Sequence, residues 1–88
     1  MTNNKKKNPS SICIIGLGFV GLTLSAVMAK KGFRVYGVEK KKNILNNLKL
    51  KKGHFYEPGL DEDLKKIIKN KKFSFHSEIP IKKDINTY

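Results

Sequence analysis

Residues 12–39 read ICIIGLGFVGLTLSAVMAKKGFRVYGVE, and this stretch decides the fold. It opens with the apolar run Ile12 to Ile15, which predicts a strand buried on both faces. Gly16-Leu17-Gly18 makes a turn, and residues 19–31 predict a helix that Gly32 stops. Arg34 to Glu39 predicts a second strand. Strand, turn, helix and strand in this order indicate a β-α-β unit with parallel strands.

The rest of the chain extends this unit in the same style. We expect the first helix to bury the apolar residues that recur at helical spacing, which are Val20, Leu24, Val27 and Met28. Residues 40–50 predict a second helix with Ile44, Leu45 and Leu48 as its apolar stripe. Pro58 opens a third helix to about residue 70, with an inward face of Leu60, Leu64, Ile67 and Ile68. Phe73 to His76 predicts a third strand. The fold class is therefore α/β, the β-α-β-α-α-β portion of a partial Rossmann fold, a doubly wound parallel sheet.

The turn inside the first unit carries a recognisable motif. Gly16-Leu17-Gly18-Phe19-Val20-Gly21 fits G-x-G-x-x-G, directly after a strand and at the start of a helix. Gly16 allows the tight turn, Gly18 lets a pyrophosphate approach the backbone, and Gly21 lets the helix pack close to the sheet. Free N–H groups at the helix start bind the phosphates. We predict a dinucleotide cofactor site at Gly16, Gly18, Phe19, Val20 and Gly21.

An acidic residue, Glu39, closes the second strand and completes the predicted cofactor site. Its carboxylate can accept hydrogen bonds from the adenosine ribose hydroxyls, and it repels a 2′-phosphate. NAD is therefore expected rather than NADP. Lys40, Lys41 and Lys42 follow immediately and keep NADP open, since their charge offsets that repulsion.

The charge of the chain is strongly positive. Lys and Arg number 19 against 7 Asp and Glu, which gives a net charge of +12, and every basic residue except Arg34 is lysine. Such a balance suits a nucleic acid or an anionic surface as a partner. Proteins that read nucleic acids favour arginine and interleaved aromatic residues, however, and this chain has no Trp. Binding to nucleic acid or to an anionic surface is therefore the least favoured alternative.

The cysteine and histidine content argues against disulfide-bonded and metal-binding classes of protein. Cys13 is the single cysteine, so no disulfide forms within the chain and no thiolate metal site is expected. We expect Cys13 to be an inert core residue and the chain to be cytoplasmic. His54 and His76 have no partners at ligand spacing, so no metal site is predicted. The uncharged stretch 8–29 superficially matches a signal peptide or membrane span, but its spaced glycines and its change of period argue against a membrane partner.

Three segments together resemble a known family. Residues 14–22 (IIGLGFVGL), 31–39 (KGFRVYGVE) and 56–60 (YEPGL) resemble the N-terminal NAD-binding domain of the UDP-glucose/GDP-mannose dehydrogenases, and the third segment is the most specific. The family usually has Asp where this chain has Glu39. The resemblance implies NAD-dependent, two-step oxidation of a sugar-nucleotide C6 hydroxyl to a carboxylate, for polysaccharide precursor synthesis. It also implies that Glu57 to Leu60, besides starting a helix, border the cofactor cleft.

The resemblance also sets what we expect this chain to lack. The family's substrate domain and catalytic cysteine segment have no counterpart before Tyr88, and Cys13 cannot replace that cysteine because it lies in the first strand. We therefore predict no catalytic residue, a disordered polar tail over residues 1–10 and an incomplete NAD-binding Rossmann domain over residues 11–88. The first hypothesis is a truncated or split dehydrogenase, which binds a nucleotide sugar only when a complementary C-terminal half is supplied. The second is a stand-alone nucleotide-binding module without chemistry.

Overall fold

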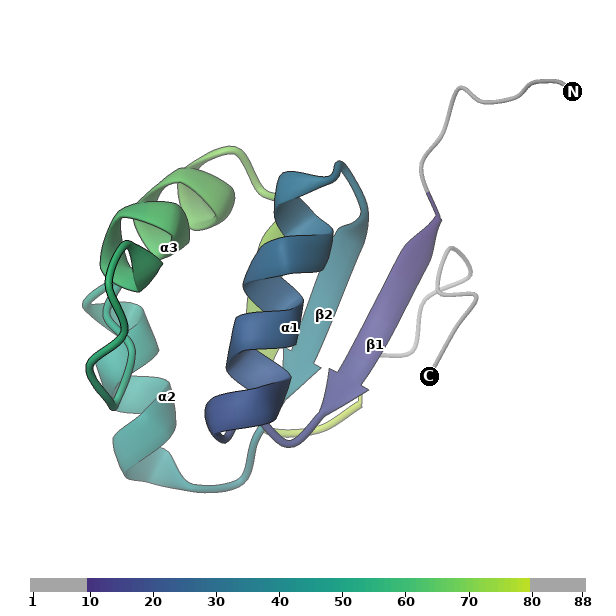
Figure 1. Ribbon diagram of the computed structural model, residues 1–88. Coiled ribbons are helices and arrows are strands. Elements are labelled where there is room, and N and C mark those ends of the chain that lie inside the picture. The colour runs from purple at the N-terminus through teal and green to yellow at the C-terminus, as the bar shows by residue number, and fades with distance from the viewer. Residues whose placement is uncertain (1–9, 80–88) are drawn as a thin grey trace, which may run out of the picture.

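The computed structural model describes residues 10–79, which form six elements in the predicted order (Figure 1). They are β1 (Ser11–Ile15), α1 (Phe19–Lys30), β2 (Arg34–Val38), α2 (Lys42–Lys49), α3 (Leu60–Lys69) and β3 (Phe73–His76). Every predicted helix and strand is present, with ends that differ by no more than two residues. The predicted tail, apart from Ser10, and the segment after residue 79 lie outside the described residues.

The three strands form one parallel sheet in the order β1-β2-β3. Ile14 pairs with Gly37 across β1 and β2, and Gly37 pairs with Phe75 across β2 and β3. All carboxyl ends therefore meet at one edge, where Figure 1 places the start of α1. This arrangement is one half of a doubly wound sheet and confirms the predicted partial Rossmann fold.

The helices bury their inward faces against the side of the sheet that presents Val35 and Phe73. The predicted stripe of α2 is confirmed for Ile44 and Leu48, and that of α3 is confirmed for its first three members. Each large side chain buried in this way contributes roughly 1.5–3 kcal/mol. The core cluster consists of Leu17, Leu22, Ala26, Ala29, Val35, Ile44, Leu48, Leu60, Leu64, Ile67 and Phe73.

The predicted buried face of α1 is wrong. Val20 is 73% exposed, and Leu24 and Val27 are each about half exposed, while only Met28 packs partly against the core. The helix carries apolar residues on almost every side, so their spacing does not identify the inward face. Its close approach to the sheet selects mainly small residues instead. Those buried are Leu22, Ser25, Ala26 and Ala29.

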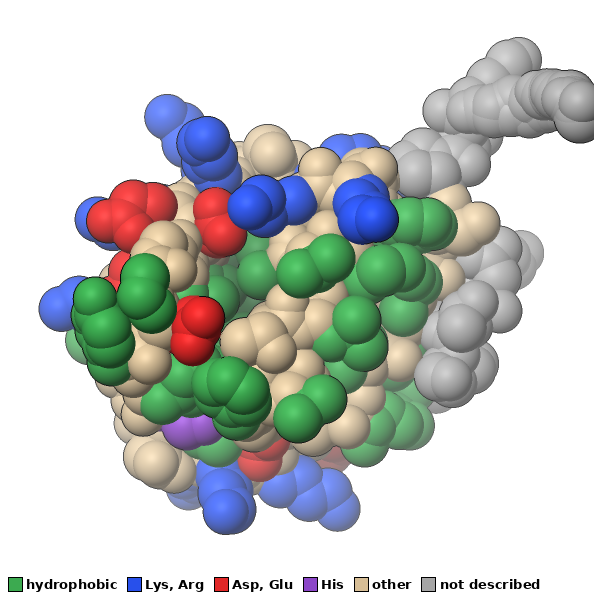
Figure 2. Space-filling model, viewed as in Figure 1, with side chains coloured by type: hydrophobic (Ala, Val, Ile, Leu, Met, Phe, Trp, Pro, Cys, Tyr) green, Lys and Arg blue, Asp and Glu red, His purple; other side chains and the backbone are tan. Residues whose placement is uncertain are grey.

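The outward side of α1 is consequently apolar and exposed. We call this surface the apolar strip and define it as Phe19, Val20, Leu24 and Val27. Figure 2 shows hydrophobic side chains gathered over this helix. At one end of the helix, Lys30 Nζ lies 3.1 Å from Asp63 Oδ2 on α3, a half-exposed ion pair that contributes no more than about 1 kcal/mol.

The helices are short. The longest, α1, has 12 residues, whereas a bilayer needs about 20 apolar ones. Within residues 10–79, no helix combines the length and the apolar character needed to cross a membrane.

Candidate functional site

The turn after β1 is tied to the end of β2. Gly16 has φ +90°, in the left-handed region where glycine is favoured, and its N–H donates to the Val38 carbonyl oxygen at 2.8 Å. Two residues later, Gly18 is the N-cap of α1 and provides no side-chain cap. The start of α1 therefore opens directly onto the glycine turn.

Gly21 holds α1 close to β1. A Cβ at this position would lie 1.8 Å from the Gly16 carbonyl oxygen and 3.6 Å from Ile14 Cγ2, so no side chain fits. This is the packing role that the motif predicts for Gly21. Sequence reasoning missed a similar position, Gly37 on β2, where a Cβ would lie 2.8 Å from a Leu17 methyl group.

The backbone N–H groups at the start of α1 are available to a ligand. Leu22 is the first residue of the helix whose N–H donates back to the turn, to the Gly18 carbonyl oxygen at 2.9 Å. Within residues 10–79, the N–H groups from Gly18 to Gly21 have no acceptor, and the first turn contains no acidic residue. A Cβ on Gly18 would meet no atom within 4 Å, so the approach is open. Four free N–H groups and the positive end of the helix dipole fit a pyrophosphate.

Glu39 lies beside this turn and uses both carboxylate oxygens. Its Oε1 accepts the Leu17 N–H at 2.8 Å, and its Oε2 accepts the Lys41 N–H at 2.9 Å. These bonds, that of Lys41 first and that of Leu17 second, hold the pKa of the Glu39 carboxyl below its ordinary value. Glu39 is therefore charged at neutral pH and lies next to the turn, where ribose hydroxyls can reach it. The bond to Leu17 was not predicted.

The other two predicted site residues lie at the exposed start of α1. Phe19 is 57% exposed and Val20 is 73% exposed, so their side chains border the turn from outside. The centroids of the Phe19 and Phe55 rings lie 5.0 Å apart. This contact places the loop between α2 and α3 beside the glycine turn.

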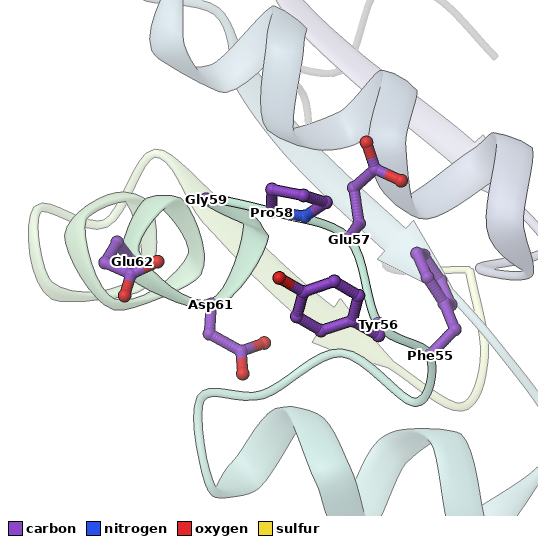
Figure 3. A pocket seen from close by; sticks show the side chains of 7 residues that line it. All are labelled: Phe55, Tyr56, Glu57, Pro58, Gly59, Asp61 and Glu62. Carbon is purple, nitrogen blue, oxygen red and sulfur yellow. The ribbon is translucent and has the colours of Figure 1, made fainter.

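That loop contains a hollow of about 250 Å³. Figure 3 shows the Tyr56 and Asp61 side chains directed toward one another, whereas Glu57 points toward α1. Asp61 also accepts the Gly53 N–H at 2.9 Å, so one of its oxygens stabilises the loop. Glu57, Asp61 and Glu62 give the hollow a negative lining that repels phosphate. Phosphate groups are therefore expected at the glycine turn and not in the hollow.

The cysteine and histidine residues form no second site in the described part of the chain. Cys13 is 2% exposed, and burial raises the pKa of its thiol, which keeps it protonated and unreactive. His76 Nε2 lies 2.9 Å from Ser74 Oγ. Between residues 10 and 79, no three His, Cys, Asp or Glu side chains are grouped so that they could hold a metal ion.

The family model for the NAD-binding domain of the UDP-glucose/GDP-mannose dehydrogenase family matches residues 10–86. The UDP-N-acetyl-D-mannosamine dehydrogenase of Methanococcus vannielii is 35% identical over 71 residues, which are 81% of this chain and 17% of that protein. The enzyme of the same name from Campylobacter jejuni is 40% identical over 52 residues, 59% of this chain and 13% of that protein.

The fold has solved counterparts as well. The UDP-glucose dehydrogenase of Pyrobaculum islandicum superposes with a TM-score of 0.77 at 29% identity, over 89% of this chain and 18% of that one. The chain thus spans between about an eighth and a fifth of the length of these relatives. The part that it matches is the cofactor-binding part.

Proposed function

This chain belongs to the UDP-glucose/GDP-mannose dehydrogenase family as an NAD-binding domain, and we propose that it holds NAD at the glycine turn while a longer dehydrogenase polypeptide oxidises a nucleotide sugar. The observation that carries the proposal is the set of four acceptor-free N–H groups from Gly18 to Gly21 at an uncapped helix start. The open space at Gly18 lets a pyrophosphate approach these groups.

Each predicted site residue has a distinct part in this proposal. The N–H groups from Gly18 to Gly21 hold the pyrophosphate, and Gly16 shapes the turn. Both oxygens of Glu39 keep a further lone pair for the hydroxyls of the adenosine ribose. NAD supplies the hydride acceptor when it is bound, and the residues of this chain bind and orient it. No described side chain is proposed to act on the substrate.

The substrate proposal comes from the relatives, whose names specify UDP-N-acetyl-D-mannosamine and UDP-glucose. We propose a UDP-linked sugar, oxidised at its C6 hydroxyl to a carboxylate. The groups that bind and attack the sugar come from a complementary dehydrogenase portion that associates with this one. The proposal includes a cytoplasmic location, which the single buried thiol of Cys13 supports.

Calorimetry of the chain with NAD, NADP and ADP tests the binding step. We expect NAD and ADP to bind and NADP to bind more weakly, because Glu39 repels a 2′-phosphate. Gly18→Ala should fold normally, since φ is −69° and no atom lies near the added methyl group, yet weaken NAD binding by narrowing the approach. Val27→Ala, at the other end of α1, is the control. Absence of affinity for all three nucleotides would overturn the proposal.

An activity assay separates the alternatives. The chain is mixed with a relative's complementary portion, a UDP-sugar and NAD, and NADH is followed by absorbance. NADH formation that depends on both parts supports the split dehydrogenase. Tight NAD binding without NADH formation favours the stand-alone binding module. Binding to DNA that weakens steeply with salt, without nucleotide binding, would favour the role that the net charge suggests.

A further inference from the structure

The carboxylate of Glu39 joins two segments that are far apart in the sequence. Leu17 lies in the glycine turn, 22 residues before Glu39, and Lys41 is the N-cap of α2. One carboxylate oxygen accepts the N–H of each at 2.8 and 2.9 Å. The same side chain therefore connects the turn at the end of β1 to the segment that leaves β2.

Leu17 is held in place from both sides. Its side chain is fully buried in the core, against Gly37 and Phe73, while its N–H faces Glu39. This N–H donates to Glu39 Oε1. A hydrogen bond to a charged acceptor is about twice as strong as a neutral one. Removal of Glu39 would therefore free the N–H at the centre of the turn.

The hydrogen bonds divide the N–H groups of the turn into two sets. Those of Gly16 and Leu17 are taken by Val38 and Glu39 at the end of β2. Within residues 10–79, those from Gly18 to Gly21 have no acceptor and stay free for an anion. The bonds of the first set fix the orientation of the peptide planes of Gly16 and Leu17. The peptide planes that carry the free N–H groups follow directly along the chain. The orientation of the phosphate-binding groups thus depends on a contact that involves no ligand.

We propose that Glu39 is a positioning residue that holds the phosphate-binding turn in shape before any nucleotide arrives. This inference rests on the proposed function for its consequence, nucleotide binding, but the contact itself exists in the free protein. Aspartate is shorter by one methylene, about 1.5 Å, so we expect Glu39→Asp to lose at least one of these two bonds from the same backbone. Glutamine has the right length, but it offers one acceptor in place of two.

The first experiment uses the ligand-free, ¹⁵N-labelled full chain. The amide shifts of Leu17 and Lys41 should titrate together, with a midpoint below the pH at which a free glutamate titrates. In Glu39→Gln both inflections should vanish, and the Leu17 amide should exchange with solvent about tenfold faster or more, the scale of one hydrogen bond to a charged group. Glu57→Gln removes the same charge from an exposed loop position and should change neither amide. Independent titration of the two amides, or none, overturns the proposal.

The second experiment separates positioning from ribose contact. Pyrophosphate has no ribose, and Glu39→Asp keeps the negative charge, so this probe and this variant isolate the shape of the turn. We expect Glu39→Asp to weaken pyrophosphate binding about tenfold. Unchanged pyrophosphate affinity together with weaker NAD affinity would mean that Glu39 acts on the ribose alone. If the wild-type chain binds no nucleotide, the proposed function fails, while the coupled titration of Leu17 and Lys41 still decides the positioning role.

Discussion

Gly21→Ala should destabilise the chain far more than its single methyl group suggests. The new Cβ would lie 1.8 Å from the Gly16 carbonyl oxygen, and real contacts of this kind are not shorter than 3.0 Å. The obstructing atom is backbone, in a turn bound to Val38, so it cannot rotate away. Helix α1 must therefore move outward by more than 1 Å.

The magnitude follows from that displacement. A gap of about 0.5–1 Å already forfeits a quarter to a half of the dispersion energy of the atoms that separate. Leu22, Ala26 and Ala29 on α1 would all lose contact in this way. Overpacking costs about 1–3 kcal/mol and occasionally more, and the gain of about 1 kcal/mol from replacing a helical glycine offsets part of it. We expect a net loss of about 2 kcal/mol, at the upper end of that range, which lowers Tm by roughly 8–16 °C in a domain of this size.

The assay is thermal and urea unfolding followed by circular dichroism. Gly18→Ala is the matched control, because the same methyl group is added three residues earlier where no atom lies within 4 Å. Its Tm should stay within a few degrees of the wild-type value. A Gly21→Ala variant as stable as Gly18→Ala would refute the reasoning, since α1 could not then lie as close to β1 as described.

Three further predictions follow from the same structure. Leu64→Ala, in the core face of α3, should cost about 2–5 kcal/mol in urea unfolding, whereas Leu24→Ala on the exposed side of α1 should cost less than about 1 kcal/mol; the reverse order would contradict the assignment of the two faces. Asp63→Asn removes the exposed pair with Lys30 and should change stability by less than about 1 kcal/mol at low salt. Folding lowers the pKa of Glu39, so its stabilising contribution is present above about pH 4.3 and is lost as the pH falls through the folded value. Below about pH 4.3, the urea unfolding midpoint of Glu39→Gln should therefore change less with pH than that of the wild-type chain.

The order and type of the elements could be predicted because local patterns agree with the final fold. The β-branched run of β1, the stop at Gly32 and the amphipathic pattern of α3 each depend on near neighbours. Gly16 and Gly21 could be given their structural roles in the same way, since the motif already contains the constraint that the turn imposes.

The face of α1 could not be predicted by the same means. Its sequence offers apolar residues on opposite sides, so Leu22 and Ala26 compete with Leu24 and Val27 for burial. The choice is made by the distance between helix and sheet, which depends on the contact of Gly21 with Gly16 and Ile14 in the turn and β1. The small residues at positions 21, 25, 26 and 29 were the signal that could have identified the correct face.

The bond between Glu39 and Leu17 was also beyond sequence reasoning. It joins a side chain to a backbone group 22 residues away, and its existence depends on the register of β1 and β2. The only local signal was the presence of glutamate where the family usually has aspartate. A longer carboxylate side chain at that position can reach a more distant N–H donor, and here that donor is the Leu17 N–H of the glycine turn.

The apolar strip on α1 has a practical consequence for anyone who prepares this chain. A net charge of +12 keeps copies apart, and this repulsion opposes the contact that the four exposed apolar side chains of the strip would otherwise favour. Added salt shortens the range of the repulsion to about 3 Å at 1 M and leaves the apolar attraction intact. High-salt washing, the usual way to strip nucleic acid from a basic protein during purification, is therefore the step at which precipitation should begin. Dilute buffers should keep the chain monomeric and in solution.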